Sequence, residues 1–295
     1  MGANRVEDRG TAASSLGRVA ALVDAELDRF LSDRRAELAA MDPASTVLVD
    51  ELVRLGAAGG KRFRPALCYW AFRSAGGDEG PPIVRAAAAL ELLHMFALIH
   101  DDVMDRSPER RGVPSTYAWF AAEAPPGVDA LAYGTSVAIL TGDLAAVLSE
   151  WLLRRCGASS GPLEAALGRF DRMRAEMAAG QFLDLRAGGG PAAPRVAALK
   201  TASYTAEGPV LVATALAGAG PAVEGPLRVF AGLVGEAFQL RDDVLDGDAE
   251  PGSAGRVNDL VERALASLEA APLERGGVAA LTDLAGLLRL DEEPR

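Results

Sequence analysis

Two copies of one acidic pentapeptide are the residues of this chain best suited to chemistry. They are Asp101-Asp102-Val103-Met104-Asp105 and Asp242-Asp243-Val244-Leu245-Asp246, and each follows an apolar run. In a helix, the first and last aspartates of each copy lie on one face, where like charges repel by roughly 0.2–0.5 kcal/mol. A hard cation would offset this repulsion, because Mg²⁺ is usually held by one or two carboxylates together with water and phosphate oxygens. The two motifs therefore predict several Mg²⁺ ions around one diphosphate.

Polar side chains accompany both motifs at helical spacing. His94 lies seven residues before Asp101. Gln239 lies three residues before Asp242 and seven before Asp246. Each therefore shares a helix face with its carboxylates. A solvated acidic helix end is the plain alternative for a single motif, but an ordinary core seldom places so many polar groups along one stripe.

Basic residues gather in three short segments. The segment Gly59–Pro65 puts three cations on a glycine loop whose proline starts a helix, and helix N-termini favour phosphate. Arg110 and Arg111 follow the first acidic motif, where their planar guanidinium groups could each donate two hydrogen bonds to a phosphate. Lys200 with Thr201 gives a further cation beside a hydroxyl. Each segment alone could be a surface charge cluster, but together with the aspartates they indicate an anion site.

The composition predicts an all-α fold. Hydrophobic residues make up 49% of the 295 residues and aromatic residues only 5%, so the chain can bury a large core that is rich in alanine and leucine. Apolar residues recur at spacings of three and four in six long runs, which is a helical pattern. These runs are Val19 to Ala40, Ile83 to Asp102, Thr135 to Arg155, Leu163 to Leu185, Leu227 to Asp246 and Val257 to Ala271. No stretch alternates as a strand would, so we expect a helical bundle.

The charge and the apolar pattern limit the partners of the protein. A net charge of -11 and a pI near 4.8 argue against nucleic acid, which is gripped by basic faces. We expect no transmembrane segment, because no uninterrupted apolar stretch reaches the ~18 residues that span a bilayer. The N-terminus lacks the pattern of a signal peptide, so a cytoplasmic location is expected. Cys68 and Cys156 stand in apolar, helical contexts and are expected to be buried free thiols.

Taken together, these segments resemble the trans-isoprenyl diphosphate synthases of the polyprenyl synthase family. The matching segments, in the family's order, are GGKRFRP at 59–65, ELLHMFALIHDDVMD at 91–105, RRG at 110–112, GD at 142–143, QFLD at 181–184, KTASYT at 200–205 and AFQLRDDVLD at 237–246. The resemblance implies a single large antiparallel helical bundle of the isoprenoid synthase type with a central cavity. This domain would span residues 16–295, after a disordered tail at 1–15.

The resemblance also implies roles for individual residues. Isopentenyl diphosphate would be held by Lys61, Arg64, His94 and Arg111. An allylic diphosphate would contact Arg110, Lys200, Thr201 and Gln239. Three Mg²⁺ ions, with the diphosphate bound, would be ligated by Asp101, Asp105, Asp242 and Asp246. The residues expected to carry catalysis are Asp101, Asp102, Asp105, Lys200 and Asp242.

The resemblance also implies that Phe96 helps to set the chain length of the product. It stands five residues before Asp101, is followed by the small Ala97, and no residue is inserted within the acidic motif. This combination resembles the short-chain type that forms geranylgeranyl diphosphate, or farnesyl diphosphate, with Phe96 as the floor of an apolar tunnel. An ordinary core phenylalanine is the alternative. Because the family usually forms homodimers, the resemblance predicts one here as well.

One departure from the family pattern keeps other functions open. After the second acidic motif, family members usually carry further Gly-Lys segments, whereas here Gly247 to Arg256 leads almost directly into a C-terminal helix pattern. The domain thus looks shortened after residue 248. A class I terpene cyclase is one alternative, although it would have no use for the residues assigned to isopentenyl diphosphate. A catalytically impaired or regulatory synthase subunit is the other, although it would have no use for so many costly aspartates near a core.

Overall fold

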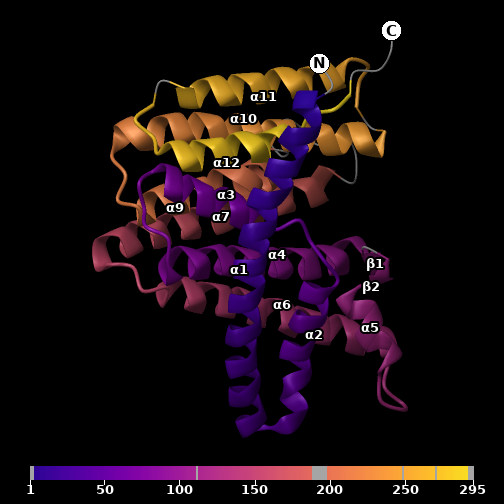
Figure 1. Cartoon of the computed structure of the whole chain (residues 1–295). Helices are drawn as coiled ribbons and strands as arrows, with labels where there is room; N and C mark the ends of the chain where they lie inside the picture. The colour runs from indigo at the N-terminus through magenta and orange to yellow at the C-terminus, as the bar shows by residue number, and fades with distance from the viewer. Residues whose placement is uncertain (1–2, 111, 188–197, 248, 270, 292–295) are drawn as a thin grey trace. The chain divides into compact units, whose positions relative to one another are not determined.

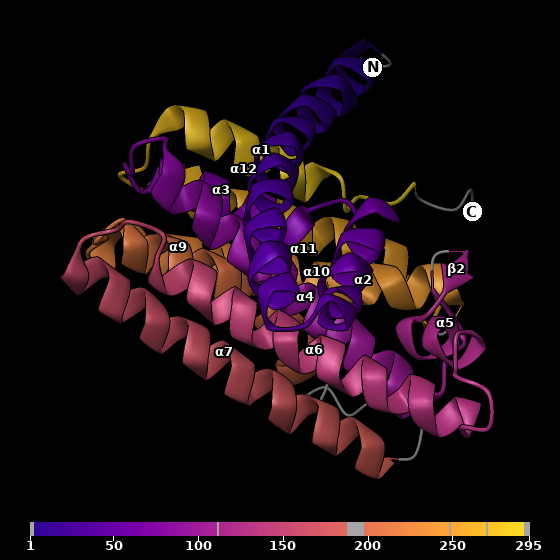
Figure 2. The same cartoon turned by 90° about the horizontal axis from the view of Figure 1, so that it is seen from below.

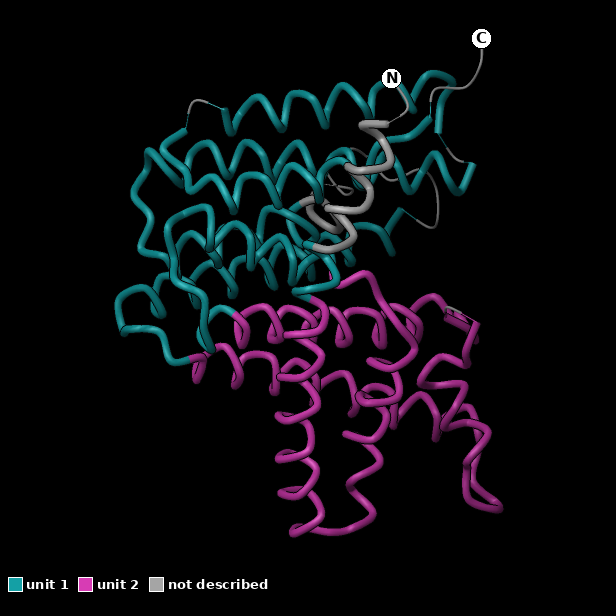
Figure 3. Tube along the Cα trace, viewed as in Figure 1, with its two compact units in different colours: residues 1–19, 63–83, 157–295 teal, residues 20–62, 84–156 magenta. Residues whose placement is uncertain are grey.

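The structure is a computed structural model of the chain (Figure 1). It describes residues 3–110, 112–187, 198–247, 249–269 and 271–291, and of residues 3–14 and 198–202 it describes the backbone alone. The described secondary structure is almost wholly helical, which confirms the predicted all-α class. The chain divides into two compact units (Figure 3). Unit 1 comprises Met1–Val19, Phe63–Ile83 and Gly157–Arg295, and unit 2 comprises Ala20–Arg62 and Val84–Cys156.

Unit 2 carries the first acidic motif. Its elements are most of α1 (Ala3–Met41), η1 (Pro43–Thr46), α2 (Val47–Ala57), most of α4 (Pro81–Asp105), β1 (Glu109–Arg110), β2 (Val113–Pro114), α5 (Thr116–Ala122) and α6 (Ala130–Arg154). Asp42 and Asp129 cap η1 and α6, since their side chains accept hydrogen bonds from the first free N–H groups of those helices. α5 and α2 both pack against α6. α4 is apolar on all sides over Ala86–Leu93 apart from the buried Glu91, as expected of a helix that runs through a core.

Unit 1 carries the second acidic motif. Its elements are α3 (Phe63–Ser74), α7 (Ser160–Ala187), the π-helix η2 (Ala198–Glu207), α9 (Gly208–Leu216), α10 (Pro221–Asp246), α11 (Ser253–Glu269) and α12 (Arg275–Gly286), together with the ends of α1 and α4. α10 lies along α11 and also packs against η2, while α3 packs between α9 and α12 (Figures 1 and 2). Gly277 lets α12 approach the backbone of α3 closely, because a Cβ there would lie 2.3 Å from the Ser74 nitrogen.

All six predicted helical runs coincide with helices of the structure. The sequence analysis does not predict β1 and β2, which pair as a two-residue antiparallel ladder. It also starts the helix of the second motif too late, since α10 begins at Pro221, where the missing N–H of proline costs nothing. Cys68 and Cys156 are buried and free, which confirms that expectation. The tail at 1–15 stays a prediction, although α1 already begins at Ala3 within it.

Two of the described helices are long and apolar enough to cross a membrane by length and composition alone. They are α4, with 61% of its apolar window buried inside the protein, and α6, with 33% buried. A buried core helix passes the same test, so the finding is weak support for a membrane span. The absence of a transmembrane segment stays a prediction.

Candidate active site

The first acidic motif forms the last turn of α4. Asp101 and Asp105 lie one turn apart on the same face of this helix, as predicted. The side chain of Asp101 is 28% exposed and Asp105 is exposed, so both carboxylates are accessible to a ligand. The helix ends in a Schellman-type turn, because Arg106 has a positive φ of 55° and the Ser107 N–H donates to the Asp102 carbonyl over 3.0 Å.

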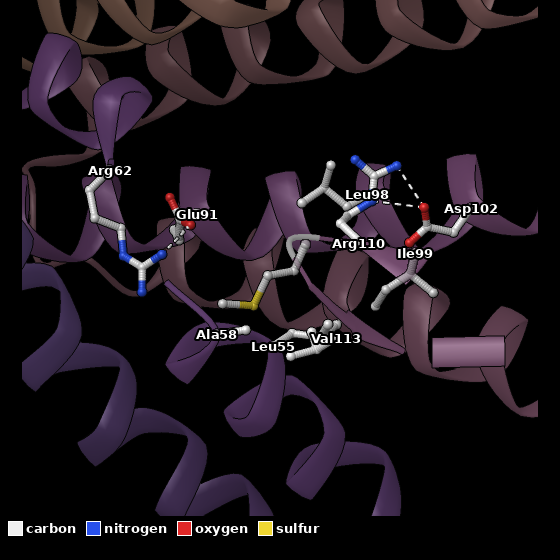
Figure 4. A pocket seen from close by; sticks show the side chains of 10 residues that line it. Leu55, Ala58, Arg62, Glu91, Leu98, Ile99, Asp102, Arg110 and Val113 are labelled. Carbon is white, nitrogen blue, oxygen red and sulfur yellow. Dashed lines mark hydrogen bonds and ion pairs between the residues drawn. The ribbon is translucent and has the colours of Figure 1, made fainter. Parts of the chain in front are cut away.

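Asp102, the middle residue of the motif, is buried in an ion pair (Figure 4). Its Oδ1 accepts hydrogen bonds from Nε of Arg110 over 2.7 Å and from the terminal NH2 nitrogen of that guanidinium over 2.6 Å. Burial raises the pKa of Asp102 above its usual range, while the hydrogen bonds and charge of Arg110 oppose that rise. The same NH2 nitrogen lies 3.7 Å from Oδ2 of Asp101. The pair thus suits Asp102 for holding a cation beside the outer carboxylates rather than for ligating a metal.

Phe96 and His100 pack against each other on α4. Their ring centroids are 4.7 Å apart in an edge-on arrangement, and Phe96 is only half-buried. Nε2 of His100 lies 3.2 Å from the carbonyl of Ile139 on α6. Gly142 makes room for the imidazole, because a Cβ at this position would lie 2.3 Å from the ring. The helix that carries the first motif is therefore fixed to α6 one residue before Asp101.

The glycine loop presents its three cations in different ways. Lys61 is exposed, whereas Arg62 is buried with a positive φ of 50°. Arg64 is half-buried at the start of α3, and its NH2 nitrogen donates to Oγ1 of Thr205 over 2.9 Å. Its guanidinium carbon also lies 4.5 Å from the ring centroid of Tyr204, a cation–π contact. Arg64 is thus anchored on η2, the helix that carries Lys200.

The second acidic motif forms the last turn of α10. Asp242 is half-buried and Asp246 is exposed, in parallel with the outer aspartates of the first motif. The middle residue, Asp243, is half-buried and accepts a hydrogen bond from Nε2 of Gln239 over 2.7 Å. The helix ends at Gly247, which takes a left-handed φ of 84° that glycine adopts without strain. Gln239, predicted to contact the allylic diphosphate, therefore also braces the motif from within its own helix.

The π-helix η2 carries the KTASYT segment. Ser203 anchors it to α7, since its Oγ donates to Oε2 of Glu176 over 2.5 Å, and Arg172 donates to the other oxygen over 2.8 Å. Burial pushes the pKa of Glu176 upward, but these two hydrogen bonds outweigh it and hold the pKa below its usual range. π-helical turns occur often at functional sites. The side chains of Lys200 and Thr201, like the whole of Arg111, lie outside the described residues.

Comparison with known proteins identifies the family. The sequence profile named Polyprenyl synthetase matches residues 46–275, which is more than half of the chain. The chain belongs to the polyprenyl synthetase family. It is 36% identical over 236 residues to the geranylgeranyl diphosphate synthase of Mycobacterium tuberculosis, covering 77% of this chain and 62% of that protein. It is 31% identical over 246 residues to the enzyme of the same name from Methanosarcina mazei, covering 81% of this chain and 69% of that protein.

Solved structures show the same fold. A geranylgeranyl pyrophosphate synthase from Corynebacterium glutamicum, described as complexed with isoprenyl diphosphate and magnesium, aligns with a TM-score of 0.83 at 25% identity. The alignment covers 92% of this chain and 98% of that one. The fold is therefore that of the isoprenoid synthases, as the resemblance implied. The chain nevertheless spans less than two thirds of the M. tuberculosis relative that it matches.

The site residues predicted from the family pattern divide between the two units. Those of unit 2 are Lys61, His94, Phe96, Asp101, Asp102, Asp105 and Arg110. Those of unit 1 that the structure describes with side chains are Arg64, Gln239, Asp242 and Asp246. Within unit 2, the structure brings Asp101, Asp102 and Arg110 together as predicted from their closeness in sequence. His94 is half-buried on α4, seven residues before Asp101.

The family implies a magnesium site, and the acidic motifs fit one. Among the described residues, no three histidine, cysteine or acidic side chains gather into a ready-made site. A metal site made of three protein side chains is not needed, because Mg²⁺ keeps several waters and is usually bound by one or two carboxylates plus substrate phosphates. Asp101 with Asp105, and Asp242 with Asp246, each offer two oxygen ligands one turn apart on a helix end. The donor set is the one that a hard cation requires.

Some residues that lie beside the predicted site residues were missed from the sequence. Arg62 and Glu91 fall inside the matching segments GGKRFRP and ELLHMFALIHDDVMD, but their burial could not be read from residue type. His100 precedes the first motif directly, and its neighbour Gly142 belongs to the matching GD segment. The matching segments thus contained all of these residues, but only the packing of the folded chain shows what each of them contacts.

Proposed function

We propose that the protein is a short-chain trans-isoprenyl diphosphate synthase that condenses isopentenyl diphosphate with an allylic diphosphate. The observation that carries this proposal is the arrangement at the end of α4. Two outer carboxylates lie one turn apart and accessible, while the buried middle aspartate holds the Arg110 guanidinium 3.7 Å from Asp101. This places a fixed cation beside a metal-binding face, which suits a diphosphate leaving group. The names of the M. tuberculosis and M. mazei relatives support the same class of reaction.

The reaction needs charge stabilisation rather than a nucleophilic side chain. Arg110, Lys200, Thr201 and Gln239 would bind the allylic diphosphate, and Lys61, Arg64, His94 and Arg111 would hold isopentenyl diphosphate. The allylic carbon–oxygen bond breaks, and the diphosphate leaves with the electron pair. The double bond of isopentenyl diphosphate then forms a bond to the allylic cation, and loss of a proton restores a double bond. Arg110 is suited to the first step, because a cation held in place by Asp102 needs no reorganisation as charge develops.

Asp101, Asp105, Asp242 and Asp246 would hold Mg²⁺, and we propose three ions when the diphosphate is bound. The bound metal would stabilise the negative charge of the departing diphosphate. In this proposal both acidic motifs serve the same diphosphate. Asp102 differs from the outer aspartates, because its carboxylate is buried and already paired with Arg110.

The product that we propose is geranylgeranyl diphosphate, with farnesyl diphosphate as the shorter possibility. Two relatives are named geranylgeranyl diphosphate synthase. A nonaprenyl diphosphate synthase of M. tuberculosis, which is named for a longer product, is also 30% identical to this chain over 218 residues. The names of relatives thus do not decide chain length. Phe96, on α4 below the first motif and only half-buried, is our candidate for the floor of the product tunnel.

We further propose a cytoplasmic homodimer. Large apolar side chains are exposed along α6 at Leu131, Ile139, Leu140 and Val147. An exposed apolar stripe of this kind suits contact with a second protein surface. The proposed partner is a second copy of the chain, in line with the family resemblance.

The proposed function is tested by incubating the purified protein and Mg²⁺ with farnesyl diphosphate, with and without isopentenyl diphosphate. Elongation that requires both substrates is the expected result. A hydrocarbon formed from farnesyl diphosphate alone would point to a terpene cyclase instead. If dimethylallyl, geranyl and farnesyl diphosphates all give no product with isopentenyl diphosphate, the protein is not an active synthase by itself.

A further inference from the structure

Arg62 is the buried cation of an otherwise exposed loop. It stands between the exposed Lys61 and the start of α3, and only 6% of its surface is accessible. Its backbone has a positive φ of 50°, which residues other than glycine rarely adopt. A strained conformation of this kind persists only where the surroundings fix it. Something in the fold therefore holds this arginine in place.

The guanidinium of Arg62 makes hydrogen bonds in three directions. Nε donates to Oδ1 of Asp24 on α1 over 2.8 Å, and NH1 donates to Oε1 of Glu91 on α4 over 2.8 Å. NH2 donates to the carbonyl of Gly56 on α2 over 2.9 Å. Only an arginine offers a rigid fork that can reach three separated acceptors. The side chain thus ties the loop to three helices of unit 2.

The pair with Glu91 is the buried part of this arrangement. The side chains of Arg62 and Glu91 are 6% and 5% exposed, whereas that of Asp24 is 49% exposed. Taking two charges out of water costs more than most ion pairs return, so stability alone is a weak reason to keep such a pair. A requirement for fixed geometry is the better explanation.

Both ends of the pair adjoin residues that would bind isopentenyl diphosphate. Arg62 follows Lys61 directly, so fixing Arg62 fixes the backbone from which the lysine extends. Glu91 precedes His94 by three residues on α4, which is about one helical turn. We propose that Arg62, paired with Glu91, is a positioning residue that sets Lys61 relative to His94. This inference rests on the proposed function, because that function assigns both residues to isopentenyl diphosphate.

The separation of two ion pairs in unit 2 should confine this effect to one substrate (Figure 4). The pairs Arg62–Glu91 and Arg110–Asp102 lie at opposite ends of one small hollow. Apolar side chains line the hollow between them, namely Leu55, Ala58, Met95, Leu98, Ile99 and Val113. Arg62 and Arg110 donate hydrogen bonds to different residues, and the lining between the two pairs is apolar. A change at Arg62 should therefore leave the arginine beside Asp101 in place.

The test removes both charges together. Arg62→Met alone removes the charge that pairs with the buried Glu91 and can unfold the protein, so the informative variant is Arg62→Met with Glu91→Leu. We expect this double variant to keep a Tm near that of the wild type. Its KM for isopentenyl diphosphate should rise about tenfold or more, since small misplacements of binding groups cost that much. The KM for the allylic diphosphate should stay within about twofold.

The control is Arg85→Met, which removes an arginine of α4, also in unit 2, that pairs with Glu26 of α1. It should leave both KM values unchanged. Equal increases of both KM values in the double variant, or no increase for isopentenyl diphosphate, would overturn the proposal. Wild-type protein without turnover would instead overturn the proposed function.

A measurement without substrate distinguishes a failure of the positioning proposal from a failure of the proposed function. Hydrogen exchange of the backbone amides at residues 58–62 reports how firmly the loop is held. We expect these amides to exchange about tenfold faster in the double variant than in the wild type or in Arg85→Met. Unchanged exchange in the double variant would show that Arg62 does not position the loop, whatever the enzyme's activity.

Discussion

The two acidic motifs share a sequence pattern and a place in the last turn of a long helix, yet they are braced in different ways. In the first, Asp102 is 3% exposed and pairs with Arg110, which reaches it from the β1–β2 hairpin. In the second, Asp243 is half-buried and accepts a hydrogen bond from Gln239, four residues earlier in the same helix. The middle aspartate of the first motif is thus tied to another element of unit 2, while that of the second accepts a hydrogen bond from its own helix.

This difference indicates that the two motifs differ in how far they are organised before a ligand binds. A guanidinium held between a buried aspartate and Asp101 is preorganised before any ligand arrives. The second motif shares an exposed outer aspartate and a left-handed helix end with the first, but its middle aspartate, Asp243, accepts its hydrogen bond from Gln239 of the same helix. We therefore expect the first motif to resist change as a folded unit and the second to depend more on the bound metal and diphosphate.

The largest effect is expected from the outer aspartates, where the two motifs should behave alike. Asp101→Asn and Asp242→Asn should each lower turnover by at least about 10²-fold, because each weakens a metal site that stabilises the leaving group. Steady-state kinetics at saturating Mg²⁺ measures this. Asp33→Asn, at an exposed aspartate of α1, is the matched control and should turn over normally. Normal turnover by Asp101→Asn would remove the metal assignment of the first motif.

The middle aspartates should separate the two motifs. Asp102→Ala removes the buried carboxylate that accepts the hydrogen bonds of Arg110 and should cost about 2–4 kcal/mol of unfolding free energy. Asp243→Ala loses one hydrogen bond in a more open site and should cost about 1 kcal/mol or less. Urea unfolding followed by circular dichroism compares them. Equal losses would mean that the two motifs are braced to the same extent.

Gly142 tests how the first motif is fixed to α6. Gly142→Ala would put a Cβ 2.3 Å from the His100 imidazole and should destabilise the protein by about 1–3 kcal/mol, with a fall in turnover. Gly168→Ala on α7 meets nothing within 4 Å and should be neutral or stabilising by up to about 1 kcal/mol. Thermal unfolding of both variants checks the contrast. If Gly142→Ala is as stable as Gly168→Ala, the imidazole does not need the glycine.

The smallest effect is expected at Glu176, which anchors η2 in unit 1. Its pKa is held below the usual range despite burial, because Ser203 and Arg172 donate to it. A lowered folded-state pKa means that its stabilisation is full above the ordinary glutamate pKa of about 4.3 and is lost as the pH falls through the lowered value. Glu176→Gln should thus cost about 1 kcal/mol at pH 7 and less at pH 3.

The control for Glu176 is Glu164→Gln, at an exposed position of the same helix. Its unfolding free energy should match that of the wild type at both pH values. A pH-independent loss in Glu176→Gln would contradict the assigned hydrogen bonds, because an uncharged contact would not titrate.

Much of the fold could be predicted because it is local. The six apolar runs with helical spacing contain the information for the long helices. The two strands could not be predicted, because two residues give no period to recognise and the ladder depends on the turn at Gly112. The predicted run for α10 starts only at Leu227, although α10 itself begins at Pro221, because proline is favoured in the first turn of a helix.

The site could be predicted in its residue types but not in its contacts. The spacing of Asp101 and Asp105 was sufficient to place them on one face. Nothing in the spacing of Gly59–Pro65 distinguishes the exposed Lys61 from the buried Arg62, because burial depends on α1 and α4, which lie far away in the sequence. Residue type thus identifies the chemistry, while the tertiary structure decides which cations are free to perform it.

The central claim is that both acidic motifs serve one magnesium-bound diphosphate. Calorimetric titration of inorganic diphosphate into the protein, with and without Mg²⁺, tests it in the wild type, Asp101→Asn, Asp242→Asn and the double variant. We predict one Mg²⁺-dependent diphosphate per chain, lost largely in either single variant and little further in the double variant, since the two motifs act on the same ligand. Two independent Mg²⁺-dependent diphosphates per chain, each abolished by only one of the substitutions, would contradict the account.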